Sequence, residues 1–152
     1  MNDIKVQLNY FLVKVFNDVL KTEEGCLSTG EFKDLSIREM HIIESVCRAN
    51  DNGTDNRAST IAQDQRITAG TLTTAVSLLE RKGYLFRKQD VKDKRVIRIY
   101  PTNKGNEANK VHAKFHKDMV DDVMDVLDSE EAVVFIKGLD AIQEFFESKY
   151  SK

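Results

Sequence analysis

The sequence predicts a mainly α-helical protein that carries one β-hairpin, and three observations support this fold class. Apolar residues recur with helical spacing over most of the 152 residues. A single proline and seven glycines leave few helix breaks. The apolar spacing changes from 3.6 to 2 only between residues 84 and 101. With 41% hydrophobic residues, the chain is long enough for one globular domain, or for a small domain with a helical extension.

The first predicted helix runs from about Asp3, a suitable N-cap, to about Lys21. Its apolar stripe consists of Ile4, Leu8, Phe11, Leu12, Val15 and Val19. This stripe can be buried only against a partner. A second helix is predicted to follow Ser36, because Ser36 and Glu39 have the spacing of a capping box.

Two short helices joined by a tight turn are predicted next. The first spans about Ala58 to Gln65, although Arg57 stands where a capping serine or threonine is expected. The second follows Thr68, a good N-cap, and ends before Gly83, which comes after a cationic last turn. Its core face consists of Leu72, Ala75, Val76 and Leu79. This pattern is typical of a helix-turn-helix.

The opposite face of that last helix carries no long and no acidic side chain. It consists of Ala69, Gly70, Thr71, Thr73, Thr74 and Ser77. A helix face this small can approach another surface very closely.

Two runs of alternating residues, YLFRKQ and RVIRIYP, flank the charged segment DVKDK. They predict a β-hairpin, which we call the wing. Thr102 then caps a helix over about 103–126, and a last helix starts at Ser129 and runs to about Ser148. The apolar stripe of the last helix consists of Val134, Phe135, Leu139, Ile142, Phe145 and Phe146.

These elements divide the single chain, residues 1–152, into two kinds of region. Residues 36–102 form a winged helix-turn-helix, and residues 1–30 and 103–152 form a helical region. The apolar stripes of the helical region are too broad for the small winged domain to cover. The sequence therefore predicts a homodimer that buries them between two copies.

Charge is distributed very unevenly along the chain. Its formal net charge is −2, yet residues 81–104 carry nine basic and two acidic side chains. That segment therefore has a local charge of +7, and the rest of the chain −9. A basic hairpin next to a small helix face is expected to attract a polyanion such as nucleic acid.

Several other function classes lack support in the sequence. The two cysteines, Cys26 and Cys47, form no C-x-x-C pair, and no secretory leader is apparent, so we expect free thiols and a cytoplasmic protein. The run VQLNYFLV is far shorter than the roughly 20 apolar residues of a membrane span. There is no glycine-rich phosphate loop, no G-x-S-x-G and no H-E-x-x-H. The sequence predicts that this protein is not an enzyme.

The segments LLERKGY, DVKDKR and PTNKG resemble the MarR family of winged-helix transcription regulators over essentially the whole chain. The family signature, Asp-x-Arg at the wing tip, corresponds to Asp93-Lys94-Arg95. The segments FKDLSIREMHIIESV, GTLTTAVSLLERKGY and KFHKDMV are most similar to the branch that represses type II fatty-acid synthesis genes in Gram-positive bacteria.

The resemblance implies how the chain binds DNA. The second short helix enters the major groove, where Gly70, Thr71, Thr73, Thr74 and Ser77 face base edges and phosphates of an AT-rich palindromic operator. Many relatives carry a long polar or basic side chain in place of Thr74. In the wing, Lys88, Lys92 and Lys94 contact phosphates, and Asp93 orients Arg95 toward a narrow minor groove.

The same branch responds to long-chain acyl groups on acyl carrier protein, which strengthen operator binding. An acyl chain requires an apolar slot. Its predicted lining is Phe11, Val15, Met40, His41, Ile43, His112, Phe115, His116 and Met119. Ordinary core packing is the alternative for each of these residues, and Lys33, Lys114 and Lys117 are candidates for contact with the acidic carrier.

The histidines leave a second function open. His112 and His116 are four residues apart, a spacing that lets two imidazoles reach one metal ion. Together with His41, and with Glu24 or Cys26 upstream, they resemble the ligands of a zinc-responsive MarR branch that represses metal-uptake genes. Met40 differs from the acidic residue that commonly stands at that position of the zinc branch. The third interpretation is that the histidines form hydrogen bonds between helices.

Overall fold

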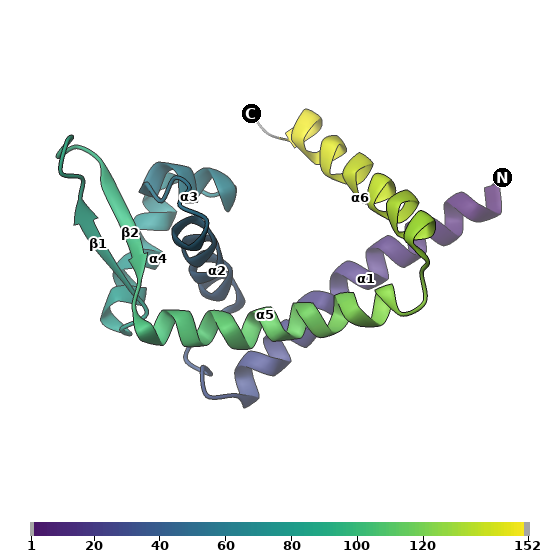
Figure 1. Cartoon of the computed structure of the whole chain (residues 1–152), viewed down its shortest axis with the longest axis horizontal. Coiled ribbons are helices and arrows are strands. Elements are labelled where there is room, and N and C mark those ends of the chain that lie inside the picture. Colours follow the sequence, from purple (N-terminus) through teal and green to yellow (C-terminus); the bar gives the residue numbers. More distant parts are fainter. Residues whose placement is uncertain (1, 151–152) are drawn as a thin grey trace. The chain divides into compact units, whose positions relative to one another are not determined.

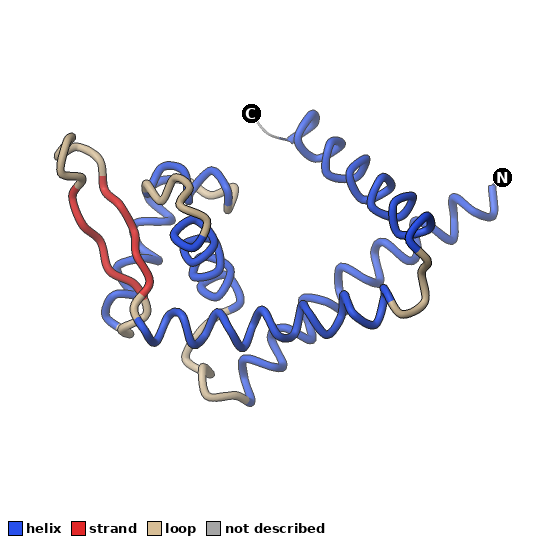
Figure 2. The backbone as a smooth tube through the Cα atoms, viewed as in Figure 1, coloured by secondary structure: helices blue, strands red, loops and turns tan. Residues whose placement is uncertain are grey.

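A computed structural model of the protein describes residues 2–150 (Figure 1). Its elements are α1 (Asn2–Thr29), α2 (Ile37–Asp51), α3 (Ala58–Asp64), α4 (Ala69–Arg81), β1 (Leu85–Gln89), β2 (Ile97–Pro101), α5 (Asn103–Met124) and α6 (Ser129–Tyr150). Figure 2 shows that the two strands form one hairpin among helices. The predicted fold class, mainly α with a winged helix-turn-helix, is confirmed.

The chain divides into two compact units, residues 1–112 and 113–152, and the boundary falls within α5. The first unit contains the whole predicted winged helix-turn-helix region.

The core of the first unit lies within the winged helix-turn-helix. α2 packs against β2, and α4 packs against both α3 and β1. The predicted core face of α4 is confirmed, since Leu72, Val76 and Leu79 are almost fully buried. Met40 and Ile43 of α2 are also fully buried there. Continuous packing of this kind gives α4 and the wing one rigid support.

The helix caps of the first unit are largely those that the sequence predicts. Ser36 and Glu39 form both hydrogen bonds of a capping box, and the Thr68 hydroxyl accepts the backbone N–H of Thr71 at 3.1 Å. The Thr102 hydroxyl accepts the backbone N–H of Gly105 at the start of α5. These caps hold the ends of α2, α4 and α5 at defined positions.

One helix end differs clearly from the sequence prediction. α1 continues to Thr29 rather than ending near Lys21, because Glu23 and Leu27 in its last turns pack against the core of the first unit. α6 begins at Ser129, as the sequence predicts. Its cap is Asp128, whose carboxylate accepts the N–H groups of the first turn, while Glu131 reaches back to the Asp128 N–H. Aspartate is as good an N-cap as serine.

The wing is a regular antiparallel hairpin in which Leu85 pairs with Pro101 and Gln89 with Ile97. Its outer face carries the stacked rings of Phe86 and Tyr100, whose centroids are 5.4 Å apart. The Lys88 ammonium lies over both rings. This arrangement fixes the direction of one wing lysine through cation–π contact.

The second unit comprises the C-terminal part of α5 and all of α6. Large apolar side chains of α6 are exposed, among them Phe135, Leu139 and Phe145. Within residues 2–150, no helix is both long and apolar enough to cross a membrane.

Candidate nucleic-acid interface

The exposed face of α4 is small and carries hydroxyl groups, as the sequence predicts. Thr73 and Thr74 are exposed, and their hydroxyls donate to the carbonyl oxygens of Ala69 and Gly70 one turn earlier, at 2.8 and 3.1 Å. The hydroxyl protons are therefore used within the helix. What α4 presents outward is methyl groups and hydroxyl lone pairs, which suit thymine methyls and hydrogen-bond donors.

Two further residues of this face have different surroundings. Gly70 is exposed, and a β-carbon placed on it would meet nothing within 4 Å. Ser77 is half-buried because its hydroxyl accepts a hydrogen bond from the Arg87 guanidinium at 3.1 Å. Thr71 is half-buried as well, next to the N-cap Thr68. The most accessible part of the face is therefore its N-terminal half.

The wing tip, residues 90–96, presents Arg95 to solvent. The Arg95 side chain is 91% exposed, and its Nε and Nη2 each lie 3.1 Å from an oxygen of Asp93. The Asp93 carboxylate also accepts the backbone N–H of Arg95. The hydrogen bond from Arg95 lowers the pKa of Asp93 below its usual value, so the pair is charged at neutral pH. Asp93 is therefore positioned to orient Arg95.

Several of the nine cations of residues 81–104 already have acidic partners in the folded chain. Lys82 pairs with Glu39 at 2.9 Å, and Arg87 with Glu80 at 2.8 Å. Hydrogen bonding from Arg87 lowers the pKa of Glu80. Six cations of this segment are exposed, namely Arg81, Lys88, Lys92, Lys94, Arg95 and Lys104. Of these, Arg95 is paired with Asp93, and Lys104 donates to the Lys82 carbonyl. The outward-facing charge is therefore smaller than the sequence count of +7 suggests, but it is gathered on α4 and the wing.

Arg66 is a candidate DNA contact that the sequence analysis missed. It lies in the turn between α3 and α4 with φ of 52°, a left-handed conformation that glycine or asparagine usually adopts. Its side chain is exposed, and within residues 2–150 it forms no ion pair. An arginine two residues before the cap of a tight helix-turn-helix was the signal available in the sequence.

The residues predicted to line an acyl pocket lie in different environments. In the first unit, Phe11 and Val15 are more than half exposed on α1. Met40 and Ile43 belong to the packed core of the winged domain, and their exposed fraction is 0%. Phe115, His116 and Met119 belong to the second unit, where the rings of Phe115 and His116 are in edge contact.

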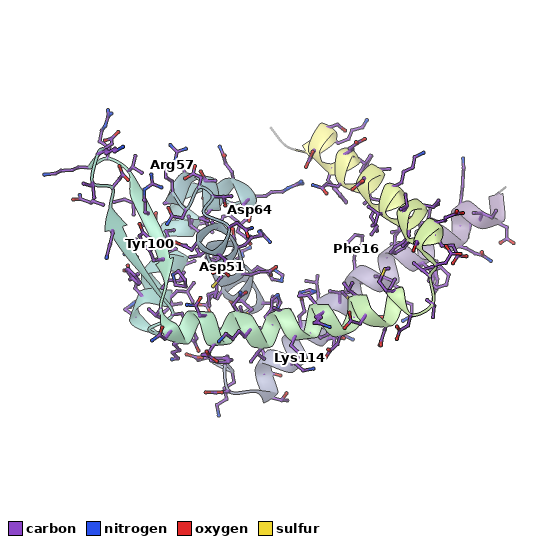
Figure 3. The ribbon with its side chains drawn as sticks, viewed as in Figure 1. Phe16, Asp51, Arg57, Asp64, Tyr100 and Lys114 are labelled. Carbon is purple, nitrogen blue, oxygen red and sulfur yellow. The ribbon has the colours of Figure 1, made fainter. Side chains whose placement is uncertain are left out.

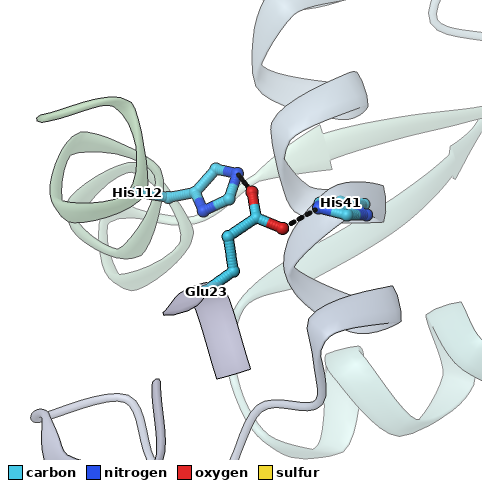
Figure 4. A group of neighbouring side chains, drawn as sticks. All are labelled: Glu23, His41 and His112. Carbon is cyan, nitrogen blue, oxygen red and sulfur yellow. Dashed lines mark hydrogen bonds and ion pairs between the residues drawn. The ribbon is translucent and has the colours of Figure 1, made fainter. Parts of the chain in front are cut away.

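The first unit brings a carboxylate and two imidazoles together from three helices (Figure 4). Glu23 of α1 is buried, and its Oε2 lies 3.3 Å from Nε2 of His41 on α2. Its Oε1 lies 3.8 Å from Nε2 of His112 on α5, which is 2.9 Å from Glu44. Glu24, the carboxylate expected here from the sequence, is exposed. The residue that meets the histidines is Glu23, because α1 continues past Lys21 and turns this side chain inward.

Comparison with known proteins assigns the family. No protein-family model matches the sequence. A MarR protein from Peptoclostridium difficile has the same fold, with a TM-score of 0.74 and 18% identity over 93% of this chain and 88% of that chain. The chain is also similar to Streptococcus pneumoniae FabT in complex with DNA, with 38% identity and a TM-score of 0.85 over 95% of this chain and 98% of that one. The chain belongs to the MarR family of winged-helix transcription regulators.

A curated sequence agrees with this assignment over a shorter span. The uncharacterized HTH-type transcriptional regulator YkoM of Bacillus subtilis is 46% identical over 41 residues, which is 27% of this chain and 27% of that protein. The chain thus matches about a quarter of the length of that relative.

Proposed function

We propose that this MarR-family protein is a sequence-specific DNA-binding repressor of type II fatty-acid synthesis genes, with long-chain acyl-acyl carrier protein as its corepressor. The observation that carries the DNA-binding part is the combination of a small exposed face on α4 with an exposed Arg95 at the wing tip. FabT of S. pneumoniae, 38% identical, was solved in complex with DNA, which supports the same part. The fatty-acid genes follow from the sequence resemblance to that branch.

The proposed binding mode uses both elements at once. α4 seats in the major groove, and because Gly70, Thr73 and Thr74 are small, the helix backbone comes close to the bases. Their methyl groups suit the thymines of an AT-rich operator. Arg95 enters the adjacent minor groove, which is narrow in AT-rich DNA and attracts guanidinium groups.

The same proposal includes a homodimer. Apolar side chains along α1, such as Phe11, Phe16 and Leu20, are 46 to 59% exposed in the single chain (Figure 3). The exposed large apolar side chains of α6 have exposed fractions of 40 to 69%. Soluble proteins rarely leave such stripes uncovered. A two-fold dimer reads a palindrome, with half-sites about one helical turn apart. Light scattering is expected to give twice the chain mass of 17.4 kDa.

The proposed corepressor places a specific demand on the first unit. Phe11 and Val15 are exposed in the single chain, whereas Met40 and Ile43 can line a slot only if the packed core opens. Burying an acyl chain against α1 and α2 would stabilise one arrangement of these helices and thereby change operator affinity. The acidic carrier would meet exposed lysines, for which Lys33 is a candidate in the first unit.

The proposal is tested by fluorescence anisotropy with an AT-rich palindromic duplex taken from upstream of a fatty-acid synthesis operon. Binding is expected to weaken steeply with salt, with log K falling by roughly 0.9 per phosphate contact for each unit of log salt. Oleoyl-acyl carrier protein, but not the unacylated carrier, is expected to tighten binding. Absence of any duplex binding would refute the DNA-binding part, and indifference to the acylated carrier would refute the corepressor.

One variant tests the role of the wing directly. Arg95→Ala is expected to weaken operator binding by about 1 to 3 kcal/mol. Arg38→Ala removes an exposed arginine from α2, outside the proposed interface, and serves as the matched control. Equal affinities for Arg95→Ala and the wild-type protein at the same salt concentration would contradict the proposed minor-groove contact.

A zinc-responsive repressor is the second candidate function, and the group formed by Glu23, His41 and His112 favours it. One ligand atom from each residue can be chosen so that all lie within 4.8 Å of one another, and nitrogen and carboxylate ligands suit zinc. In the same group, His41 is hydrogen-bonded to Glu23, and His112 is hydrogen-bonded to Glu44. Tightening of operator binding by zinc, lost in His41→Ala, would support this function over the acyl corepressor.

A further inference from the structure

The loop at the wing tip is too long to be held by turn geometry alone. Two-residue hairpin loops fix the ends of their strands by themselves, but here the last paired residues are Gln89 and Ile97. Only two described backbone hydrogen bonds close the intervening segment, from Asp90 N to the Val96 carbonyl and from Val96 N to the Asp93 carbonyl, each at 2.9 Å. Further contacts must determine the conformation that presents Arg95.

The carboxylate of Asp90 provides these contacts. Its Oδ2 accepts the backbone N–H groups of Lys92 and Asp93, each at 3.1 Å. Its Oδ1 accepts the Nε–H of Arg98 at 2.6 Å. Although the loop is at the surface, the Asp90 side chain is only 18% exposed. Asp90 is therefore turned inward, with both oxygens engaged by the wing itself.

Arg98 continues the same connection into the helix-turn-helix. Its Nη1 donates to Oδ1 of Asn56 at 2.9 Å. Asn56 is buried, and its Nδ2 donates to Oδ1 of Asn50 on α2 and to the carbonyl of Ile99. The backbone of Asn56 also accepts the Ile99 N–H at 3.0 Å. An unbroken series of hydrogen bonds thus joins α2 to the wing tip.

The charge of Asp90 makes its presence informative. A carboxylate in the most cationic segment of a DNA-binding wing repels phosphate, so its electrostatic effect alone weakens binding to DNA. The Asp90 carboxylate accepts the backbone N–H of Asp93, and the Asp93 carboxylate in turn accepts the backbone N–H and the guanidinium of Arg95. If the wing is to bind DNA well, the binding free energy gained from the structural role of Asp90 must therefore exceed the free energy lost to this repulsion.

We propose that Asp90 and Arg98 are positioning residues that fix the wing tip on the helix-turn-helix, in the conformation from which Arg95 reaches the DNA. The inference rests on the proposed DNA-binding function and adds to it the residues that prepare its contact. Because the loop is ordered when the protein folds, its ordering does not have to occur when DNA binds. If the hydrogen bonds of Asp90 and Arg98 are removed, the loop loses its conformational entropy only when DNA binds, and this loss weakens binding.

The sign of one substitution separates positioning from electrostatics. Asp90→Ala removes a negative charge next to the proposed interface, which by electrostatics alone would tighten DNA binding. Positioning predicts the opposite: binding about fivefold weaker, within the range expected for ordering a long side chain and its loop. Asp51→Ala on α2 (Figure 3) makes the same change of charge away from the wing, and is expected to leave binding unchanged or slightly tighter.

A double-mutant cycle identifies the residue through which Asp90 acts. In the Arg95→Ala background, Asp90→Ala is expected to change operator affinity by less than about twofold, because the side chain that it positions is absent. In the Thr74→Ala background on α4, the fivefold effect is expected to persist. A general loss of folding would reduce binding equally in both backgrounds, so thermal unfolding curves of each variant accompany the cycle.

The outcomes of the cycle are distinct. Two results would overturn the inference and leave the proposed function intact. In the first, Asp90→Ala binds the operator as tightly as the wild-type protein does. In the second, the losses of operator affinity caused by Asp90→Ala and Arg95→Ala simply multiply in the double variant. A wild-type protein that binds no duplex would refute the proposed function itself. Without DNA, amide hydrogen exchange at Lys92 and Asp93 is expected to be at least about tenfold faster in Asp90→Ala, because both N–H groups lose their acceptor. Unchanged exchange would also overturn the inference.

Discussion

Replacing Gly105 by alanine tests how closely α5 must approach the backbone of the winged domain. A β-carbon on Gly105 would lie 2.2 Å from the Tyr84 carbonyl oxygen, and 3.6 Å from Cβ of Pro101. Ordinary carbon–oxygen contact needs about 1 Å more. Because Tyr84 is fully buried, its carbonyl cannot simply turn outward. The start of α5 and the hairpin would have to move apart.

The magnitude follows from what that movement disrupts. The Tyr84 carbonyl accepts the backbone N–H of Thr102 at 3.0 Å, and the Thr102 hydroxyl lies at the same distance while it caps α5. A shift of about 1 Å would break one or two of these bonds, at about 1 kcal/mol each. Overpacking adds about 1 to 3 kcal/mol. Alanine returns up to about 1 kcal/mol through its higher helix propensity, so we expect a net loss of about 1 to 5 kcal/mol.

The assay is urea unfolding followed by circular dichroism, at one fixed protein concentration, since unfolding of a dimer depends on concentration. Gly70→Ala is the matched control, because Gly70 also lies in the first turn of a helix and a β-carbon there meets nothing within 4 Å. It is expected to be as stable as the wild-type protein or more stable by up to about 1 kcal/mol. If Gly105→Ala unfolds within about 0.5 kcal/mol of the wild-type protein, the close approach is not what holds α5.

Three further predictions follow from single sites. Arg66→Gly is expected to raise the free energy of unfolding by up to about 1 kcal/mol, because glycine adopts the left-handed backbone conformation without strain. The same variant is expected to bind DNA more weakly and with a smaller salt dependence, and a lower free energy of unfolding would contradict this prediction. Burial raises the pKa of Cys47 to about 12, so an aromatic disulfide reagent should modify only the exposed Cys26 in the native protein at neutral pH, and both thiols in urea. The pKa of Glu80 is lowered by its hydrogen bond from Arg87, so the stability from this pair is fully present above the unfolded pKa near 4.3 and is lost as pH falls through the lower folded pKa. Glu80→Gln is therefore expected to make the free energy of unfolding depend less on pH in the acid range.

The helices, their caps and the wing could be predicted because their causes are local. The capping box of Ser36 and Glu39 and the cap at Thr68 each depend on residues three positions apart. The strands of the wing follow from alternation along a short segment. The exposed hydroxyl face of α4 follows from helical periodicity in the same way.

The end of α1 was predicted less well, since nothing in the local pattern marks it. The residues after Lys21 stay helical because Glu23 and Leu27 contact side chains from distant parts of the chain. For the same reason the sequence pointed to Glu24, a neighbour of the buried carboxylate, as the partner of the histidines. A one-residue error is enough to exchange an exposed position for a buried one on a helix.

The sequence by itself thus determined the order of elements, the small face of α4 and the cationic wing that carries Arg95. Only the tertiary structure decided which charges are already neutralised and which residues hold the wing in place. Asp90 meets Arg98 within the hairpin, but Arg98 meets Asn56 across 42 positions of sequence. Glu23 and His112 are separated by still more of the chain. Local patterns fix helices and turns through short-range hydrogen bonds, whereas contacts between distant residues depend on how those elements pack.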